Sequence, residues 1–313
     1  MEEIQSLTDL QAAPIDKKDW KKHLKELQVT NVIFSGWGMP MTTPEFLDSA
    51  PQLKALFYGA GSIRGFYHPE IFARNVIVTS SWKANAIPVA EFAFGQIIMA
   101  LKKAHHWTRW IKKRHCWGNA GGGRFPMAGA FDSTVGLVSL GSIGRHVLRL
   151  LQSLDVKVVA YDLGLDPHEA RSLGCEAVSL EEVFRLSDVV SLHTALLPET
   201  HGFIQEEHLH QMKKNATLIN TARGALIDQK ALVRVLRKRK DLSAILDVTS
   251  PEPPPLWHPL YRMSNVFLTP HIAGSLFDEC QRMGQFAVDE CRRWMDGNAL
   301  QHQVTPEMME SMA

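Results

Sequence analysis

The chain has 313 residues, more than one hydrophobic core usually organises, so two domains are expected. Its formal net charge of +1 gives no electrostatic reason to expect binding to nucleic acid or to a membrane surface. The basic runs at residues 17–22, 112–114 and 237–240 lie on or beside amphipathic segments, so we interpret them as solvated helix faces rather than as a phosphate-binding patch.

The cysteines and the apolar runs favour a cytoplasmic protein. Four cysteines are present: Cys116, Cys175, Cys280 and Cys291. They form no CxxC pair and suggest no disulfide framework, as expected in a reducing compartment. The N-terminal segment MEEIQSLTDLQ is acidic and lacks the apolar centre of a signal peptide. The longest apolar run, residues 87–101, is interrupted by Pro88, Glu91 and Gln96, which predicts a buried helix rather than a membrane span.

The first hundred residues predict a small parallel sheet. A helix is expected at residues 17–27, with no clear strand before it, and Thr43 is expected to cap a second helix that has Pro44 at its first position. Three strands are expected, at residues 32–34, 53–58 and 76–79. Strands that alternate with helices favour parallel pairing, so these elements predict a first α/β domain.

From residue 88 to about residue 113 the pattern is helical and mostly apolar in its first half. His105, His106 and His115 lie near its end and resemble metal ligands, but no carboxylate or cysteine shares their spacing. We therefore expect no metal and interpret these histidines as surface or interface residues. The glycine-rich stretch 117–134 is typical of a connecting loop.

The stretch TVGLVSLGSIGRHVLRLLQSLDVKVVAYD, residues 134–162, predicts a strand, a tight turn, a helix and a second strand. The turn consists of Gly141, Ser142, Ile143 and Gly144. The N-terminus of the helix would favour a pyrophosphate, because its unpaired N–H groups and its dipole attract an anion. Asp162 ends the second strand, where it could accept hydrogen bonds from an adenosine ribose. Ser139 stands where the first glycine of GxGxxG is expected, so a βαβ crossover without a ligand is the alternative.

Polar residues follow four later strands of the predicted sheet. These strands are expected at residues 189–193, 217–221, 244–248 and 266–269, and a long helix is expected at residues 276–296. In a doubly wound sheet, ligands bind beyond the carboxyl ends of the strands. The residues at these ends are His193, Thr194, Thr221, Ala222, Arg223, Asp247 and His271.

Seven segments are similar to the signature motifs of the D-isomer-specific 2-hydroxyacid dehydrogenases. In chain order they are FYGAGSIRGF (57–66), PVAEFAFGQIIMALKK (88–103), VGLVSLGSIGR (135–145), VSLHTALLPETHG (190–202), INTARGALID (219–228), LDVTSPEPPP (246–255) and LTPHIAGS (268–275). The resemblance implies an α/β fold with a Rossmann-type doubly wound parallel sheet in a dinucleotide-binding domain at residues 101–281. It also implies a smaller, discontinuous, flavodoxin-like α/β substrate-binding domain at residues 1–100 and 282–313. The implied function is an NAD-dependent oxidoreductase that interconverts a 2-keto acid and a D-2-hydroxy acid by hydride transfer.

The resemblance assigns catalytic roles to Arg223, Glu252 and His271. Oxidation of a 2-hydroxy acid needs a cation for the carboxylate, a base for the hydroxyl proton and a nicotinamide to take the hydride. A guanidinium such as that of Arg223 can grip carboxylate and carbonyl oxygens together. His271 would be the base in oxidation and the acid in reduction, and Glu252 would hold its imidazole and favour the protonated form. Each residue alone has a structural alternative, such as a helix cap for Arg223.

The other site residues of the family are carried over by the same resemblance. Ala60 and Gly61 would offer backbone N–H groups to the substrate carboxylate, together with the side chain of Arg223. The cofactor-binding set would be Gly141, Ser142, Ile143, Gly144, Asp162, His193, Thr194, Thr221, Ala222, Asp247, His271 and Gly274. No arginine follows Asp162, whose carboxylate would repel a 2′-phosphate, so NAD is expected rather than NADP.

Three features depart from the family pattern. Ser139 in the glycine turn could lower the affinity for the cofactor without changing its binding mode. Ile63 stands where the family usually has an aspartate, so the substrate loop could differ. The absence of an opening strand before residue 17 suggests a shortened substrate domain or a start site chosen too late.

The resemblance also implies how the protein assembles. The helix that begins near Pro88 and the loop after Trp117 correspond to the dimer contacts of the family, so a homodimer is expected. The partner otherwise expected is a small 2-keto or 2-hydroxy acid. A second functional hypothesis is a dinucleotide-sensing binding protein, because the family also includes transcriptional corepressors with the same motifs.

Overall fold

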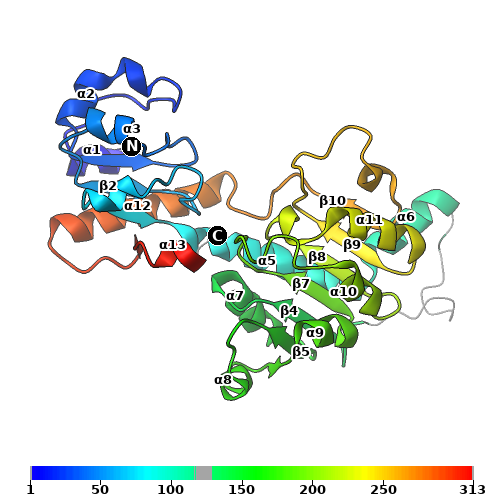
Figure 1. The fold of residues 1–313 in the computed structure, drawn as a ribbon. Coiled ribbons are helices and arrows are strands. Elements are labelled where there is room, and N and C mark those ends of the chain that lie inside the picture. The colour runs from blue at the N-terminus through cyan, green and yellow to red at the C-terminus, as the bar shows by residue number, and fades with distance from the viewer. Residues whose placement is uncertain (1, 116, 118–128, 312–313) are drawn as a thin grey trace. The chain divides into compact units, whose positions relative to one another are not determined.

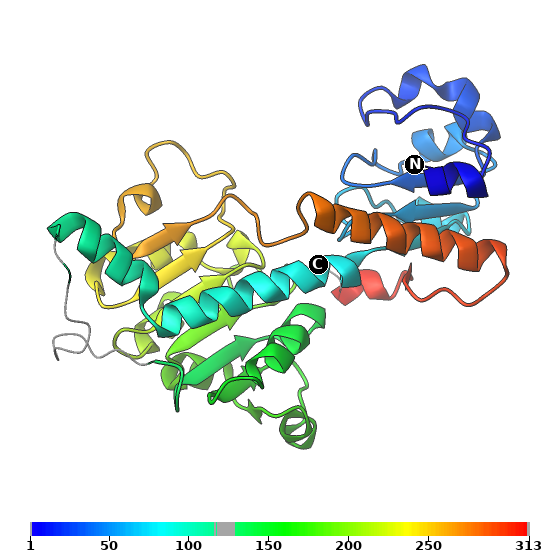
Figure 2. The same cartoon turned by 180° about the vertical axis from the view of Figure 1, so that it is seen from behind.

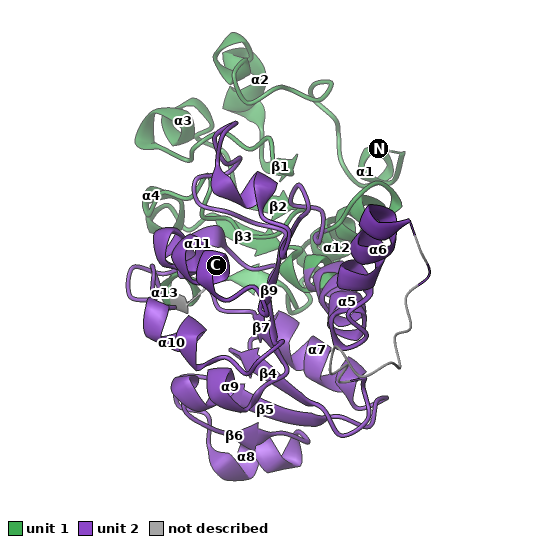
Figure 3. Cartoon of the chain, turned by 90° about the vertical axis from the view of Figure 1, so that its right-hand side faces the viewer, with its two compact units in different colours: residues 1–85, 275–313 green, residues 86–274 purple. Residues whose placement is uncertain are grey.

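The computed structural model describes residues 2–115, 117 and 129–311. They form two compact units, coloured separately in Figure 3. Unit 1 comprises Met1–Asn85 with Ser275–Ala313, and unit 2 comprises Ala86–Gly274. Most of the expected connecting loop, residues 118–128, lies outside the described residues.

The unit boundaries differ from the predicted domain boundaries after residues 100 and 281. Helix α5 (Trp82–Leu101) begins in unit 1 and continues into unit 2, where Ala93 and Ile97 are fully buried in the core. This burial assigns most of α5 to unit 2. The apolar sequence pattern could not show the boundary, because it continues through α5 without a break.

Unit 1 contains a four-stranded sheet with the order β1-β2-β3-β11. Its strands are β1 (Val32–Ser35), β2 (Ala55–Tyr58), β3 (Ile77–Ser80) and β11 (Gln303–Val304). The first three strands pair in parallel, as predicted, and β11 pairs antiparallel to β3. β11 was not predicted, because a strand of two residues carries no periodic signal.

Successive residues of β2 point to opposite faces of this sheet, and each face has its own core. Leu56 and Tyr58 belong to one apolar cluster, whereas Phe57 packs in another with Ala287 and Cys291 of the long C-terminal helix. The helices of unit 1, several of which are labelled in Figure 1, are α1 (Glu2–Leu7), α2 (Leu24–Val29), α3 (Pro44–Ser49), α4 (Glu70–Ala73), α12 (Asp278–Met295) and α13 (Met308–Ser311).

Local signals predicted one of the early helices well and another poorly. α3 begins as expected, since the Thr43 hydroxyl accepts a hydrogen bond from the Phe46 N–H at 3.4 Å and Pro44 is the first helical residue. The prediction of a single helix at residues 17–27 is wrong. A short 3-10 helix, η1 (Trp20–Lys22), and then α2 occupy this region, and the helix is interrupted at His23.

Unit 2 contains a seven-stranded sheet in which every strand is parallel to its neighbours. The order is β10-β9-β8-β7-β4-β5-β6, and the chain reverses its direction of winding between β4 and β7. The strands are β4 (Thr134–Val138), β5 (Lys157–Tyr161), β6 (Glu176–Ala177), β7 (Val189–Leu192), β8 (Thr217–Asn220), β9 (Ser243–Leu246) and β10 (Val266–Leu268). This is the doubly wound topology predicted from the sequence, with the two-residue β6 as the one strand of unit 2 that was not expected.

Helices cover both faces of the unit 2 sheet, and each face has a large apolar core (Figures 1 and 2). One face is covered by α9 (Leu180–Leu186), α10 (Glu206–Gln211) and α11 (Gln229–Lys238). The other is covered by α5, α7 (Ser142–Leu151) and α8 (Pro167–Ser172). The 3-10 helices η2 (Gly224–Leu226) and η3 (Pro259–Arg262) lie in the connections.

The helix expected at residues 88–113 is divided into two. α5 starts at Trp82, six residues before the expected start, and contains Pro88 in its second turn. After Leu101 the chain turns at Lys103, which has a φ of +53°, and α6 (Ala104–Arg114) follows. Within the described residues α5 is the one helix with the length and composition to cross a membrane, and half of its most apolar 18-residue window is buried inside the protein.

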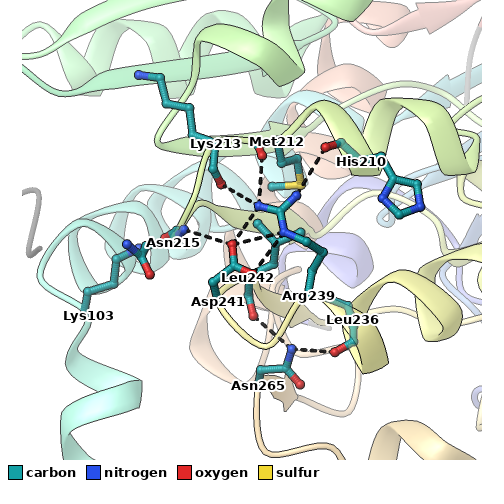
Figure 4. Close-up of polar contacts among 10 residues, drawn as sticks. All are labelled: Lys103, His210, Met212, Lys213, Asn215, Leu236, Arg239, Asp241, Leu242 and Asn265. Carbon is teal, nitrogen blue, oxygen red and sulfur yellow. Dashed lines mark hydrogen bonds and ion pairs between the residues drawn. The ribbon is translucent and has the colours of Figure 1, made fainter. Parts of the chain in front are cut away.

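Arg239 connects several segments at the amino-terminal edge of the unit 2 sheet by hydrogen bonds (Figure 4). Its Nη2 and Nε atoms donate to the carboxylate of Asp241 at 2.7 and 3.0 Å, and its guanidinium also donates to the carbonyls of His210 and Met212 at 3.2 Å. Asn265 adds hydrogen bonds to the carbonyls at the end of α11 and before β9. These contacts fix the amino-terminal edge, which is opposite the carboxyl edge of the same sheet.

Candidate active site

The parallel arrangement of unit 2 gathers polar residues at the carboxyl edge of its sheet, where ligands bind in folds of this type. One or more such residues follow each of six strands. They are Ser139 after β4, Asp162 after β5, His193 and Thr194 after β7, Thr221 and Arg223 after β8, Asp247 after β9 and His271 after β10.

The glycine turn after β4 is tightly closed. The Ser139 N–H donates to the carbonyl of Tyr161 at 2.6 Å, and Ser139 has a φ of +78°. An added Cβ on Gly144 would lie 2.1 Å from the Ser139 carbonyl oxygen, so a glycine is required there. Ser139 thus adopts the left-handed conformation that the usual glycine would adopt without strain.

Asp162 is held against this turn by backbone donors. Its carboxylate accepts hydrogen bonds from the N–H groups of Leu140 at 2.7 Å and Leu163 at 2.9 Å, and the Ser139 hydroxyl lies 3.4 Å from it. These donors fix the direction of the carboxylate. A carboxylate at the end of the second strand of a βαβ unit is the group that receives ribose hydroxyls in dinucleotide-binding folds.

The backbone around the turn fits a pyrophosphate. Gly141 precedes the first residue of α7, and an added Cβ there would meet no atom of the described residues within 4 Å. Among the described residues no side chain caps the first turn of α7, so its N–H groups remain available to an anion.

Two buried side chains further along the edge fit a polar ligand. Within the described part of the chain, neither the imidazole nitrogens of His193 nor the Thr221 hydroxyl have a hydrogen-bond partner. Buried polar atoms are nearly always paired, so these atoms indicate a ligand with hydrogen-bonding groups, such as a nicotinamide carboxamide. Burial lowers the pKa of His193 to about 4, so its imidazole is neutral at physiological pH.

His271 and Glu252 form a close polar pair at this edge. The Nδ1 atom of His271 lies 2.6 Å from Oε1 of Glu252, and both side chains are close to half exposed. The other carboxylate oxygen of Glu252 accepts a hydrogen bond from the Thr249 N–H at 3.3 Å. The carboxylate therefore fixes the imidazole ring and leaves Nε2 as the nitrogen that can exchange a proton with a substrate.

Asp247 organises the loop that carries His271. Its carboxylate is almost fully buried and accepts hydrogen bonds from the Thr269 hydroxyl at 2.6 Å and from the N–H groups of Ile272 and Ala273 at 2.9 and 2.8 Å. The His271 N–H donates to the Asp247 carbonyl at 3.0 Å, and His271 has a φ of +55°. Asp247 thus holds the backbone on both sides of the imidazole.

Arg223 is a mostly buried cation beside this pair. Burial lowers the pKa of its guanidinium, and the nearby Glu252 carboxylate raises it. The Nη1 atom donates to the carbonyl of Ala222 at 2.7 Å. Gly224 packs so closely on the next loop that an added Cβ would lie 2.0 Å from the carbonyl carbon of Thr249. The site therefore combines a desolvated cation, a carboxylate and an imidazole.

Comparison with known proteins identifies the family. Residues 94–273 match the family model described as "D-isomer specific 2-hydroxyacid dehydrogenase, NAD binding domain", which is more than half of the chain. The chain belongs to this family.

Individual relatives and a solved structure extend the similarity beyond unit 2. A glyoxylate reductase of Thermofilum pendens is 35% identical over 281 residues, which cover 87% of this chain and 81% of that protein. A D-3-phosphoglycerate dehydrogenase of Methanocaldococcus jannaschii is 28% identical over 294 residues, which cover 94% of this chain but only 54% of that protein. The structure of protein TT0316 from Thermus thermophilus covers 97% of both chains, with 28% identity and a TM-score of 0.78. The 2-hydroxyacid dehydrogenase is NAD-dependent, as the matched domain implies.

The expected site residues are divided between the two units. Unit 1 contains Ala60 and Gly61, which follow β2. Unit 2 contains the remaining members: Gly141, Ser142, Ile143, Gly144, Asp162, His193, Thr194, Thr221, Ala222, Arg223, Asp247, Glu252, His271 and Gly274. Not all of their side chains are directed to a ligand, since the Thr194 hydroxyl donates to the Val138 carbonyl at 3.3 Å and Asp247 is occupied by its loop.

Two features of the site were not found from the sequence. The loop-binding role of Asp247 depends on donors more than twenty residues away, and the contact between Gln229 and the Glu252 loop has no local pattern. As to metals, no group of three or more histidine, cysteine, aspartate or glutamate side chains that could hold an ion occurs among the described residues.

Proposed function

We propose that this 2-hydroxyacid dehydrogenase uses Arg223, His271 and Glu252 to interconvert a small 2-keto acid and its D-2-hydroxy acid. The observation that carries the proposal is the 2.6 Å contact between His271 and Glu252 at the sheet edge that also presents the partly buried Arg223. A cation for the carboxylate and an acid for the carbonyl oxygen are the two groups that keto-acid reduction requires from the protein.

Each residue has one role in the proposed reduction. Arg223 binds the substrate carboxylate and polarises the carbonyl, because a guanidinium presents two parallel N–H donors. His271 gives its Nε2 proton to the carbonyl oxygen, and Glu252 stabilises the imidazolium before the transfer. NADH, when bound, supplies the hydride to the carbonyl carbon. In oxidation the same imidazole takes the hydroxyl proton.

The cofactor is proposed to lie along the carboxyl edge of unit 2. Gly141, Ser142, Ile143 and Gly144 would hold the pyrophosphate, and Asp162 the ribose. The unpartnered atoms of His193 and Thr221 support a nicotinamide position beside them. Thr194, Ala222, Asp247 and Gly274 would complete this half of the site through their positions at the strand ends. We expect Asp162→Ala to narrow the preference for NADH over NADPH, measured as dissociation constants.

Unit 1 supports a binding site for the substrate carboxylate at Ala60 and Gly61. The Ser80 hydroxyl donates to the carbonyls of both residues, at 3.0 Å for Ala60. Their own N–H groups donate to no acceptor among the described residues, so they are available to an anion. Because the 35% identical relative is named a glyoxylate reductase, glyoxylate is the first keto acid to test.

The decisive experiment measures NADH oxidation with a panel of 2-keto acids that begins with glyoxylate. We expect His271→Gln to reduce turnover about 10² to 10⁴-fold and to leave the NADH dissociation constant within a few-fold, because a positioned general acid contributes about this factor. His201→Asn, at an exposed position, is the matched control. Tight NADH binding without turnover of any keto acid would favour the dinucleotide-sensing alternative.

We also propose a cytoplasmic homodimer. Met99 on α5 is exposed, and on α6 the partly exposed Trp107 and Trp110 rings lie 5.7 Å apart, which supports an apolar contact surface on these helices. Part of the expected interface, residues 118–128, lies outside the described residues. Sedimentation at micromolar concentration should give twice the monomer mass, and a monomer alone would contradict the proposal.

A further inference from the structure

Gln229 connects the start of α11 to the loop that carries Glu252. Its Oε1 atom accepts a hydrogen bond from the Ser250 N–H at 2.9 Å, across 21 residues of sequence. The side chain is not needed to cap its own helix, because the carboxylate of Asp228 accepts from the N–H groups of Lys230 and Ala231 at 2.9 and 3.0 Å. The Gln229 amide therefore serves the loop rather than the helix.

The loop has few backbone N–H groups with which to form hydrogen bonds. Residues 249–255, TSPEPPP, include four prolines, which have no N–H, so three backbone donors remain. The Thr249 N–H donates to the Glu252 carboxylate at 3.3 Å, and the Ser250 N–H donates to Gln229. Two side-chain hydroxyls add contacts, since Thr249 donates to the Pro251 carbonyl at 2.9 Å and Tyr261 donates to the Pro254 carbonyl at 3.1 Å. Of the two backbone donors, the Ser250 N–H is the one that binds a side chain outside the loop.

The buried Gln229 amide makes an unfavourable contribution to the stability of the fold. Its Nε2 atom is buried and has no hydrogen-bond partner among the described residues. A buried donor without a partner is unfavourable for folding. Sites where a local rule is broken are often functional, and the hydrogen bond from Ser250 indicates that the role of Gln229 lies in the loop.

We propose that Gln229 is a positioning residue for the acid–base pair, and that it acts by holding Glu252 against His271. The inference rests on the proposed function. The backbone of His271 is fixed separately, through Asp247, so loss of Gln229 would move the carboxylate relative to an imidazole that stays in place. Gly224 packs closely on the backbone of Thr249, so the first residue of the loop has a contact that does not depend on Gln229.

Three variants separate the roles of this side chain. Gln229→Leu removes the acceptor for the Ser250 N–H and replaces the amide with an apolar group of similar size. Gln229→Glu keeps an acceptor and removes the unpartnered donor. Lys230→Ala, at the next and exposed position, is the control for changes at the start of α11.

We expect Gln229→Leu to lower kcat for keto-acid reduction about 10- to 100-fold, since a misplacement of about 1 Å costs about this factor. KM and the NADH dissociation constant should stay within about threefold of the parent, because neither Arg223 nor the glycine turn is touched. Gln229→Glu should have most of the kcat of the parent, because it keeps an acceptor for the Ser250 N–H. In a Glu252→Gln background, Gln229→Leu should have no further effect on kcat, because the residue acts through Glu252.

Crystal structures of the parent and of the two Gln229 variants give a readout that needs no activity. The Nδ1 to Oε1 distance should exceed 3.5 Å in Gln229→Leu and remain a hydrogen bond in Gln229→Glu. A retained contact in both, or an equal loss of kcat in the Glu252→Gln background, would overturn the inference. A parent enzyme that turns over no keto acid would instead refute the proposed function, and the crystal structures would still decide the role of Gln229.

Discussion

The neutral, buried His193 should make the protein lose stability in mild acid. Its side chain is 7% exposed at the end of β7, and burial lowers the pKa of the imidazole from 6.5 to about 4. The unfolded chain binds a proton at this residue below about pH 6.5, whereas the folded protein resists it down to about pH 4. The stability that depends on the neutral form is therefore complete above pH 6.5 and is lost as the pH falls.

The size of the effect follows from the difference between the two pKa values. Each unit is worth about 1.4 kcal/mol, so the full difference corresponds to about 3 kcal/mol, lost by about pH 4. At about pH 5 the unfolded chain is almost fully protonated at this residue and the folded one is not, which gives a loss of about 2 kcal/mol. This is a large share of the stability of a typical domain.

The comparison of His193→Leu with the parent isolates this contribution. Urea denaturation of the cofactor-free proteins at about pH 7.5 and about pH 5, with His201→Asn as the control, gives the free energy of unfolding of each. The parent and the control should lose about 2 kcal/mol more than His193→Leu between the two values. An equal loss in all three proteins would refute the reasoning, because it would show that His193 does not stay neutral in the folded state.

Three further substitutions test the packing of unit 2. Ser139→Gly should raise the melting temperature by about 2–4 °C, measured by calorimetry, because it removes about 1 kcal/mol of left-handed strain at a φ of +78°. Asp247→Asn should lower the free energy of unfolding by about 2–4 kcal/mol in urea titrations, since an amide cannot accept from all three donors of the His271 loop. Arg239→Met should lower it by about 1–3 kcal/mol, because it removes the guanidinium that donates to Asp241 and to three backbone carbonyls, whereas the exposed Lys238→Met should have little effect.

Strong local patterns account for the parts of the fold that the sequence predicted. β4 and β7 are short apolar runs followed by a turn or a polar residue, as expected of parallel strands buried on both faces. The two-residue strands β6 and β11 have no such pattern, because their pairing depends on neighbours that are distant in the sequence. The break between α5 and α6 at Lys103 was missed, because no glycine or proline marks the left-handed residue.

For the site, too, the sequence indicated some features and not others. The resemblance of the motifs to a known family suggested Arg223, Glu252 and His271, and the structure places the last two in contact. What the motifs could not show is which atoms hold these groups in place. Asp247 has the position expected of a cofactor ligand, yet its carboxylate already accepts three hydrogen bonds from the loop of His271. Its proposed contact with the nicotinamide would have to share an oxygen with that loop.

Glu252 links the two halves of the proposed chemistry, because its carboxylate lies near the Arg223 guanidinium and contacts the His271 imidazole. It raises the pKa of the Arg223 guanidinium, which burial lowers, and its Oε1 atom lies 2.6 Å from His271. Without this charge, the Arg223 guanidinium would keep its contact with the Ala222 carbonyl but lose its neighbouring carboxylate, and the His271 imidazole would lose its anionic partner. Loss of the charge in Glu252→Gln should therefore weaken both keto-acid binding and proton donation, whereas loss of Gln229 should weaken proton donation alone, because the charge near Arg223 remains.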